Sequence, residues 1–195
     1  MTPATFATLA ALLQARAGIV LGSDKAYLLE MRLAALLARE RLASLDALAQ
    51  QLEGGRRPEL AQAVVEAMTT NETLFFRDGH PFEHMRRETL PRLCAARPPG
   101  VPLRIWSAAA SSGQEAYSLA MLIAELGGLP GQRRVEILAT DIAQAPLARA
   151  RSGLYTQFEV QRGLPVHLLL RYFRQEGTSW RIAERIRAMV EFREW

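Results

Sequence analysis

Residues 103–118 constrain the fold most. They begin as a short apolar run, pass through small residues and continue in a helical pattern. Residues 103–107 are mainly strand formers, residues 108–113 are small and end in a glycine, and apolar side chains then recur at helical spacing. The sequence therefore predicts a strand, a tight turn and a helix. The first N–H groups of such a helix have no partner within it, so a nucleotide-like ligand can approach them over the small side chains.

A second strand pattern, residues 135–140, follows that helix and ends in Asp141. A carboxylate after the second strand of a doubly wound sheet is placed to accept hydrogen bonds from a ribose. The turn alone is a weak signal, because it lacks the three glycines of the dinucleotide-binding fingerprint. Together, the turn and Asp141 favour a nucleoside site over a plain strand-to-helix connection.

The composition excludes several classes of protein. Of the 195 residues 49% are hydrophobic, which is enough to form the core of one large domain or two small ones. One cysteine, Cys94, excludes an internal disulfide and fits a reducing compartment. No apolar run approaches membrane-spanning length, and residues 6–13 lack the preceding basic residues of a signal peptide, so we expect a cytoplasmic protein. His80 and His84 have no third metal ligand near them and are expected to be surface histidines.

The first part of the chain, residues 1 to about 68, predicts a small helical bundle. Residues suited to helix ends are Thr2, Gly18, Ser23, Ser44, Gly54, Gly55 and Pro58. We expect a second helix from about residue 24 to residue 42, capped by Ser23. Its predicted inner side carries Leu28, Met31, Ala35 and Leu36. Its predicted outer side or margin carries the basic residues Lys25, Arg32, Arg39 and Arg41, which fit a solvated face and a docking surface equally well.

The helical pattern breaks at residues 69–78. Polar residues that favour caps and turns lead into Phe75, Phe76 and Arg77, which predicts a structured loop pinned by the two aromatic rings. A helix from about residue 81 to residue 96 follows.

The last third of the chain departs from strand and helix alternation. After a helix at residues 142–151, the tract at 155–188 contains two short strand patterns around Gly177, which predicts a small antiparallel insertion. Residues 189–192 predict the start of a further, buried strand. A sheet of two or three parallel strands would leave the strand at residue 103 with a bare edge that invites pairing with another chain.

Taken in this order, the segments resemble the CheR family of chemotaxis receptor methyltransferases over essentially the whole chain. The segments that carry the resemblance are Thr69-Thr70-Asn71-Glu72-Thr73, Phe75-Phe76-Arg77-Asp78, Ile105-Trp106-Ser107-Ala108-Ala109, Ser112-Gly113-Gln114-Glu115-Ala116-Tyr117-Ser118, Ala139-Thr140-Asp141-Ile142, Arg162-Gly163-Leu164-Pro165 and Arg171-Tyr172-Phe173. The Thr-Asn-Glu-Thr and Gly-Gln-Glu segments at this order and separation are specific.

The resemblance implies an α/β fold with a small N-terminal all-α bundle and a Rossmann-like methyltransferase domain, incomplete in this chain, that carries a small antiparallel β insertion. It implies a receptor-docking domain at residues 1–68, a cofactor loop and linker helix at 69–100, and a methyltransferase domain at 101–195 with its β subdomain at about 155–188. The implied activity is protein-glutamate O-methyl transfer from S-adenosylmethionine to membrane chemoreceptors, which yields S-adenosylhomocysteine.

Site residues follow from the same resemblance. Asn71, Thr73 and Arg77 are expected to line the methionine end of the cofactor and the transfer site. Glu115 would help to hold the methionine part, and Asp141 the ribose. The alternative for Arg77 is a structural ion pair with Asp78 or Glu72. Receptor docking is expected through the basic residues of the second helix, Lys25, Arg32, Arg39 and Arg41. The hairpin at residues 176–179 is short, so we expect no binding of a receptor pentapeptide.

Relatives in this family continue beyond the point where this chain ends, with segments that complete the cofactor pocket and the sheet. We therefore expect the chain to correspond to about the first two thirds of the enzyme, with its activity alone left open. A fragment of this kind can close its open edge by pairing or swapping with a second copy. Two other hypotheses are a non-catalytic module that binds receptor or cofactor, and a nucleic-acid methyltransferase suggested by the net charge of +4. The near balance of 24 basic and 20 acidic residues argues against nucleic acid.

Overall fold

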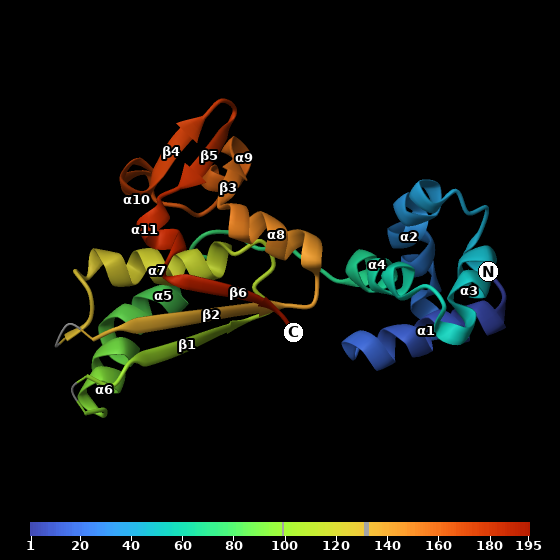
Figure 1. The fold of residues 1–195 in the computed structure, drawn as a ribbon, viewed down its shortest axis with the longest axis horizontal. Coiled ribbons are helices and arrows are strands. Elements are labelled where there is room, and N and C mark those ends of the chain that lie inside the picture. Colours follow the sequence, from blue (N-terminus) through green and yellow to red (C-terminus); the bar gives the residue numbers. More distant parts are fainter. Residues whose placement is uncertain (99, 131–132) are drawn as a thin grey trace. The chain divides into compact units, whose positions relative to one another are not determined.

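The computed structural model describes residues 1–98, 100–130 and 133–195. They form two compact units, Met1–Thr70 and Asn71–Trp195, whose elements are drawn in Figure 1. Each unit has buried apolar side chains of its own.

The first unit is an all-helical bundle. Its elements are α1 (Pro3–Ala17), η1 (Ser23–Lys25), α2 (Ala26–Glu40), α3 (Leu45–Leu52), η2 (Glu53–Gly55) and α4 (Pro58–Met68). Thr2 and Ser44 cap α1 and α3 with their side chains, and Gly18 ends α1 in the left-handed conformation, as the sequence predicts. The fully or almost fully buried leucines and valines of this bundle are Leu9, Leu13, Leu29, Leu33, Leu36, Leu45, Leu48, Leu60, Val64 and Val65.

The second helix differs from the sequence prediction in its start and in its buried face. Ser23 begins the short 3-10 turn η1 and gives α2 no capping bond, because α2 itself begins at Ala26. The buried residues of α2 are Leu29, Leu33 and Leu36. Met31 is 63% exposed and Ala35 is exposed, so their predicted burial was wrong, and Leu28 is only half-buried. The prediction failed because α2 is apolar on two sides, and periodicity alone does not say which side meets the core.

A parallel sheet forms the base of the second unit. Its strands are β1 (Leu103–Ala108), β2 (Val135–Asp141) and β6 (Val190–Glu194), in the order β1-β2-β6. Leu103 pairs with Val135 at one end of the first ladder, and Ile137 pairs with Val190 in the second. The β1–β2 connection contains α7 (Gln114–Glu125), and the β2–β6 connection contains α8 (Gln144–Ser152) and a small subdomain. Figure 1 shows α7 and α8 on the same side of this sheet.

Alternating side chains give the sheet a covered face and an open face. Leu103, Ile137 and Ala139 are buried on the covered face, where α7 is buried along almost its whole length. On the open face Trp106 is 60% exposed, and the strands line a groove of about 800 Å³. The predicted buried strand at the C-terminal end exists as β6, but its residues are half-buried or exposed, because one side of it faces this groove.

The small subdomain is an antiparallel sheet with short helices. Its elements are β3 (Leu154–Thr156), α9 (Gln157–Gln161), α10 (Val166–Tyr172), β4 (Phe173–Glu176), β5 (Ser179–Ile182) and α11 (Glu184–Arg187). The strand order is β3-β5-β4. The two strands around Gly177 confirm the predicted hairpin, whereas β3 was missed because three residues give no alternation to detect.

A broken helix leads into β1. The sequence predicts one helix from about residue 81 to residue 96, and the structure divides it into α5 (His80–His84), a π-helical turn η3 (Met85–Thr89) and α6 (Leu90–Ala95). Pro91 explains the wide turn, because proline has no N–H to donate to the carbonyl of Arg87 and its ring would clash there in an α-helix.

Candidate functional site

The turn between β1 and α7 has a strained backbone. Ala109, Ser111 and Gly113 have positive φ angles of 56°, 49° and 88°. Such angles cost a non-glycine residue roughly 1–3 kcal/mol and persist only where the surroundings fix them. A Cβ atom on Gly113 would lie 2.9 Å from Cβ of Ala150, so the turn is also closely packed against α8. Strain of this kind is common at ligand sites, and the N-terminus of the helix that follows can bind an anion or a polar ligand.

Hydrogen bonds from three other segments fix this turn. The amide of Ser111 donates to Oδ2 of Asp141 at 2.7 Å, which ties the turn to the end of β2. The hydroxyl of Ser111 donates to the carbonyl of Asn71 at 2.8 Å. The hydroxyl of Tyr155, from β3, donates to the carbonyl of Ser112 at 2.7 Å. The turn therefore joins the sheet, the loop that begins at Asn71 and the small subdomain.

Two carboxylates lie beside the turn. Asp141 is 7% exposed, and its Oδ1 accepts from the amide of Ala143 at 2.8 Å, so each carboxylate oxygen already has one backbone donor. A carboxylate oxygen accepts more than one hydrogen bond, so both can also accept from a ligand hydroxyl. Glu115, in the first turn of α7, is exposed and accepts a hydrogen bond from the Ser107 hydroxyl at 2.8 Å.

The loop from Asn71 to Gly79 is held by aromatic packing and by one buried hydroxyl. Phe75 is fully buried, and its ring lies 5.0 Å from Tyr155 and 5.6 Å from Phe173 in edge-on geometry. The amide of Phe76 donates to Oγ of Ser118 at 2.9 Å. The prediction of a structured loop pinned by the two phenylalanines is confirmed.

Arg77 lies at the outer end of this loop. Phe76 and Asp78 on either side of it have positive φ angles of 48° and 64°. Arg77 is exposed and donates to the backbone carbonyl of Glu72 at 3.4 Å, whereas the carboxylate of Glu72 pairs with Arg162 at 3.1 Å. The alternative of an ion pair between Arg77 and Glu72 is therefore not the observed arrangement. Thr73 is half-buried in the same loop.

The predicted basic residues of α2 belong to the first unit and differ in their surroundings. Lys25, Arg39 and Arg41 are exposed. Arg32 is half-buried and donates to the carbonyls of Met68 at 2.6 Å and Thr69 at 3.3 Å, so it closes the C-terminal end of α4. Sequence reasoning missed this structural role, because nothing in a helical pattern shows which arginine meets a helix end.

Tyr155 and Ser118 are two further residues of the site that the sequence did not point out. Both act on segments more than forty positions away, Tyr155 on Ser112 and Ser118 on Phe76. Among the residues that the structure describes, no cluster of three or more His, Cys, Asp or Glu side chains could hold a metal ion. Within the same described ranges, no helix is long and apolar enough to cross a membrane.

A parallel sheet with a strained strand-to-helix turn and a carboxylate after its second strand defines a Rossmann-like nucleoside-binding domain. The chain belongs to the CheR methyltransferase family. Residues 71–195 match the family model described as the CheR methyltransferase SAM binding domain, and residues 4–69 match the CheR methyltransferase all-alpha domain. The expected fold class and family are thereby confirmed, and S-adenosylmethionine is the methyl donor.

Curated relatives agree with this assignment. The chain is 46% identical to chemotaxis protein methyltransferase 1 of Pseudomonas aeruginosa over 187 residues, which cover 93% of this chain and 67% of that protein. It is 41% identical to chemotaxis protein methyltransferase Cher2 of Pseudomonas putida, with the same coverage. It is 36% identical to the chemotaxis protein methyltransferase of Escherichia coli over 92% of this chain and 59% of that protein. The chain thus spans about two thirds of the length of the first two relatives.

Proposed function

We propose that this protein transfers a methyl group from S-adenosylmethionine to glutamate side chains of membrane chemoreceptors in the cytoplasm. The observation that carries the proposal is that the Asn71 loop and Asp141 both hydrogen-bond to one strained turn, while Glu115, at the start of the helix after that turn, bonds to Ser107 at the end of β1. The two carboxylates fit the cofactor, because carboxylate oxygens accept hydrogen bonds from its hydroxyl and ammonium groups. Asp141 would hold the ribose, Glu115 the methionine part, and Asn71 and Thr73 the methionine end.

The reaction places few demands on proton transfer. A glutamate side chain has a pKa of about 4.3 and is ionised at neutral pH, so it attacks a methyl group without a general base. When bound, S-adenosylmethionine supplies an electrophilic methyl on a sulfonium. The carboxylate oxygen forms the new bond to that carbon while the carbon–sulfur bond breaks, and the electron pair stays on sulfur. What the protein contributes is alignment, for which the planar donor fork of Arg77 is suited.

Calorimetric titration with S-adenosylhomocysteine tests the cofactor site. We expect the chain to bind it and Asp141→Ala to lower the affinity by roughly tenfold or more, because the turn and the ribose lose the same acceptor. Glu136→Gln is the matched control, since Glu136 is an acidic residue of the same strand that pairs with Arg104 on the open face. Absence of binding by the wild-type chain, or equal losses in both variants, would contradict the proposed site.

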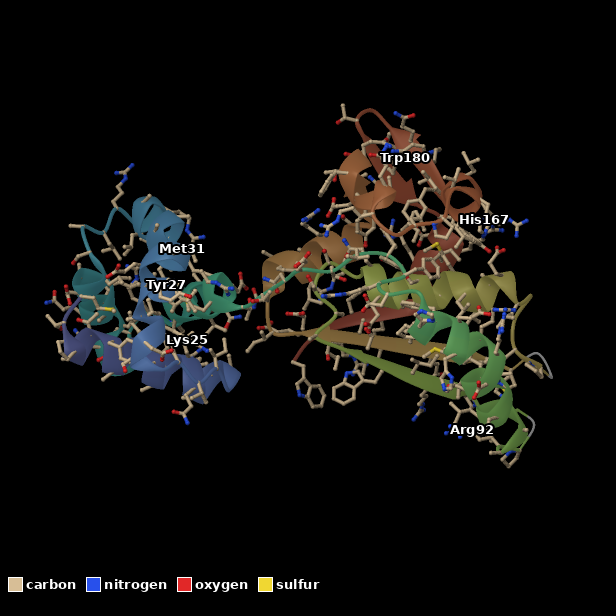
Figure 2. The ribbon with its side chains drawn as sticks, turned by 180° about the vertical axis from the view of Figure 1, so that it is seen from behind. Lys25, Tyr27, Met31, Arg92, His167 and Trp180 are labelled. Atoms are coloured by element: carbon tan, nitrogen blue, oxygen red, sulfur yellow. The ribbon has the colours of Figure 1, made fainter. Side chains whose placement is uncertain are left out.

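We also propose that the domains divide the work, with residues 1–68 docking on the receptor, residues 69–100 supplying the cofactor loop and linker helix, and residues 101–195 binding the cofactor. The docking surface consists of exposed residues of η1, α2 and the residue after α2: Lys25, Tyr27, Met31, Arg39 and Arg41. Tyr27 and Met31 are 58% and 63% exposed, one helical turn apart, and carry labels with Lys25 in Figure 2. An apolar pair between basic residues suits an acidic, amphipathic receptor helix. Arg32 supports this surface by closing α4.

Charge reversal on the docking surface should weaken receptor recognition without affecting the cofactor. For the double variant Lys25→Glu and Arg39→Glu we expect KM for the receptor to rise roughly tenfold at low salt, with the difference shrinking as salt screens it. Arg16→Glu is the control, because Arg16 is exposed on α1, outside the proposed surface. Equal KM changes in both variants would show that only net charge matters and would remove α2 from the proposal.

Two finer expectations about partners concern the second unit. The hairpin at residues 176–179 is short, and the proposal includes no binding of a receptor pentapeptide; micromolar affinity in a peptide titration would overturn it. The edge of β1, which lies at the end of the sheet order β1-β2-β6, is proposed to pair or swap with a second copy. Sedimentation that gives a monomer at all concentrations would contradict pairing.

A further inference from the structure

Tyr155 connects the small subdomain to the turn at residues 109–113. It lies on β3 and is 1% exposed. Its ring packs edge-on against Phe75 of the Asn71 loop at 5.0 Å, and its hydroxyl donates to the carbonyl of Ser112 at 2.7 Å. Burial raises the pKa of Tyr155 well above its usual value, so the hydroxyl stays protonated and remains a donor. One side chain of the subdomain therefore contacts both segments of the cofactor site.

The carbonyl that Tyr155 meets lies in the strained part of the turn. Ser112 is 6% exposed and lies between Ser111 and Gly113, both of which have left-handed backbones. A buried carbonyl that loses its donor costs more than the hydrogen bond itself contributed, because water does not reach it. Without the tyrosine hydroxyl, the turn can regain a partner for this carbonyl only by moving, and Ser111 is free to leave its strained conformation.

We propose that Tyr155 is a positioning residue through which the small subdomain sets the affinity of the protein for S-adenosylmethionine and its product. The inference rests on the proposed function only in placing the cofactor over this turn. Tyr155 acts through the turn: its hydroxyl fixes Ser112, and its ring supports Phe75. Any change that shifts β3 relative to α7 then reaches the cofactor through one hydrogen bond.

A second buried tyrosine provides a matched control. Tyr117 on α7 is also 1% exposed, and its hydroxyl donates to a backbone carbonyl, that of Ala150, at the same distance of 2.7 Å. The rings of Tyr117 and Tyr155 lie 6.3 Å apart in one core. Phenylalanine at either position keeps the ring and removes one buried hydrogen bond. The two variants therefore differ in which carbonyl is left without a donor.

The first measurement is amide hydrogen exchange by NMR on the full chain without ligand. Urea unfolding gives the global stability of each variant, and the exchange rates are corrected for the difference in stability. In Tyr155→Phe we expect the amides of Ser111 and Gly113 to exchange at least about tenfold faster than in the wild type, because both lie in the turn that loses its support. In Tyr117→Phe we expect no change at these two amides. Equal exchange in both variants would overturn the proposal, whether or not the chain binds the cofactor.

The second measurement is calorimetric affinity for S-adenosylhomocysteine. Tyr155→Phe should bind about tenfold more weakly than the wild type, and Tyr117→Phe within about twofold of it. Equal affinity of the two variants would contradict the role of Tyr155. A wild-type chain that does not bind would contradict the proposed cofactor site instead, and the exchange data would still decide whether Tyr155 fixes the turn.

Discussion

Replacement of Arg77 by alanine is expected to slow methyl transfer by about a hundredfold while changing the affinity for S-adenosylhomocysteine by no more than about threefold. Arg77 lies between two residues with left-handed backbones and donates to the Glu72 carbonyl, which fixes the loop that presents its guanidinium. A donor fork held in this way can orient an incoming carboxylate. The product lacks the transferred methyl and the attacking glutamate, so its binding reports little of that alignment.

The control for Arg77 is its neighbour Arg162. Arg162→Ala also removes a guanidinium from this region, but one that is half-buried, pairs with the Glu72 carboxylate and stacks on the ring of Phe158 at 5.3 Å. Single-turnover rates and calorimetric affinities for both variants give the comparison. If Arg77→Ala turns over at the wild-type rate, Arg77 has no part in the transfer. If the single-turnover rate falls by the same factor in both variants, the loss is due to the change in local charge and not to the alignment of the glutamate.

Alanine at position 163 is expected to lower the free energy of unfolding by about 3 kcal/mol, the sum of a backbone cost and a steric cost. Gly163 has a φ of 82°, and a Cβ atom there would lie 2.0 Å from the carbonyl oxygen of Phe75. Because the neighbour is backbone, it cannot rotate away as a side chain would. The Asn71 loop must move, so we also expect weaker binding of S-adenosylhomocysteine.

Gly177 separates the two costs. Its φ is 60°, but nothing lies within 4 Å of a Cβ atom placed there. Gly177→Ala should therefore lower the free energy of unfolding only by the cost of the left-handed backbone, about 1 kcal/mol. Urea unfolding of both variants measures the difference. Equal losses of unfolding free energy in the two variants would mean that the Asn71 loop moves away from the new methyl group at no cost. The contact between residues 163 and 75 would then not fix the site.

Local signals made much of the fold predictable. The small residues at 108–113 and the hairpin at Gly177 both depend on chemistry within a few positions, and each element lies where the sequence indicates. The buried face of α2 was not predictable in the same way, because leucines and alanines line two sides of the helix and only the partner helices decide between them.

Contacts between distant residues account for what the sequence could not supply. Gly163 looks like any loop glycine until the carbonyl of Phe75 is found against it. Tyr155 looks like an ordinary strand aromatic until its hydroxyl meets Ser112, and Arg32 like a surface charge until it meets the end of α4. Resemblance to a family supplied candidate cofactor residues, but it did not indicate which groups hold them in place.

The position of the small subdomain in the chain has a consequence for the order of folding. β6 pairs with β2, yet the whole subdomain lies between them in sequence. Bringing distant strands together carries an entropic cost that increases with the length of free chain between them. The subdomain, with its hairpin of β4 and β5, is rich in local contacts, which form early. Once formed, it shortens the free chain, so β6 can join the sheet as a late and less costly step.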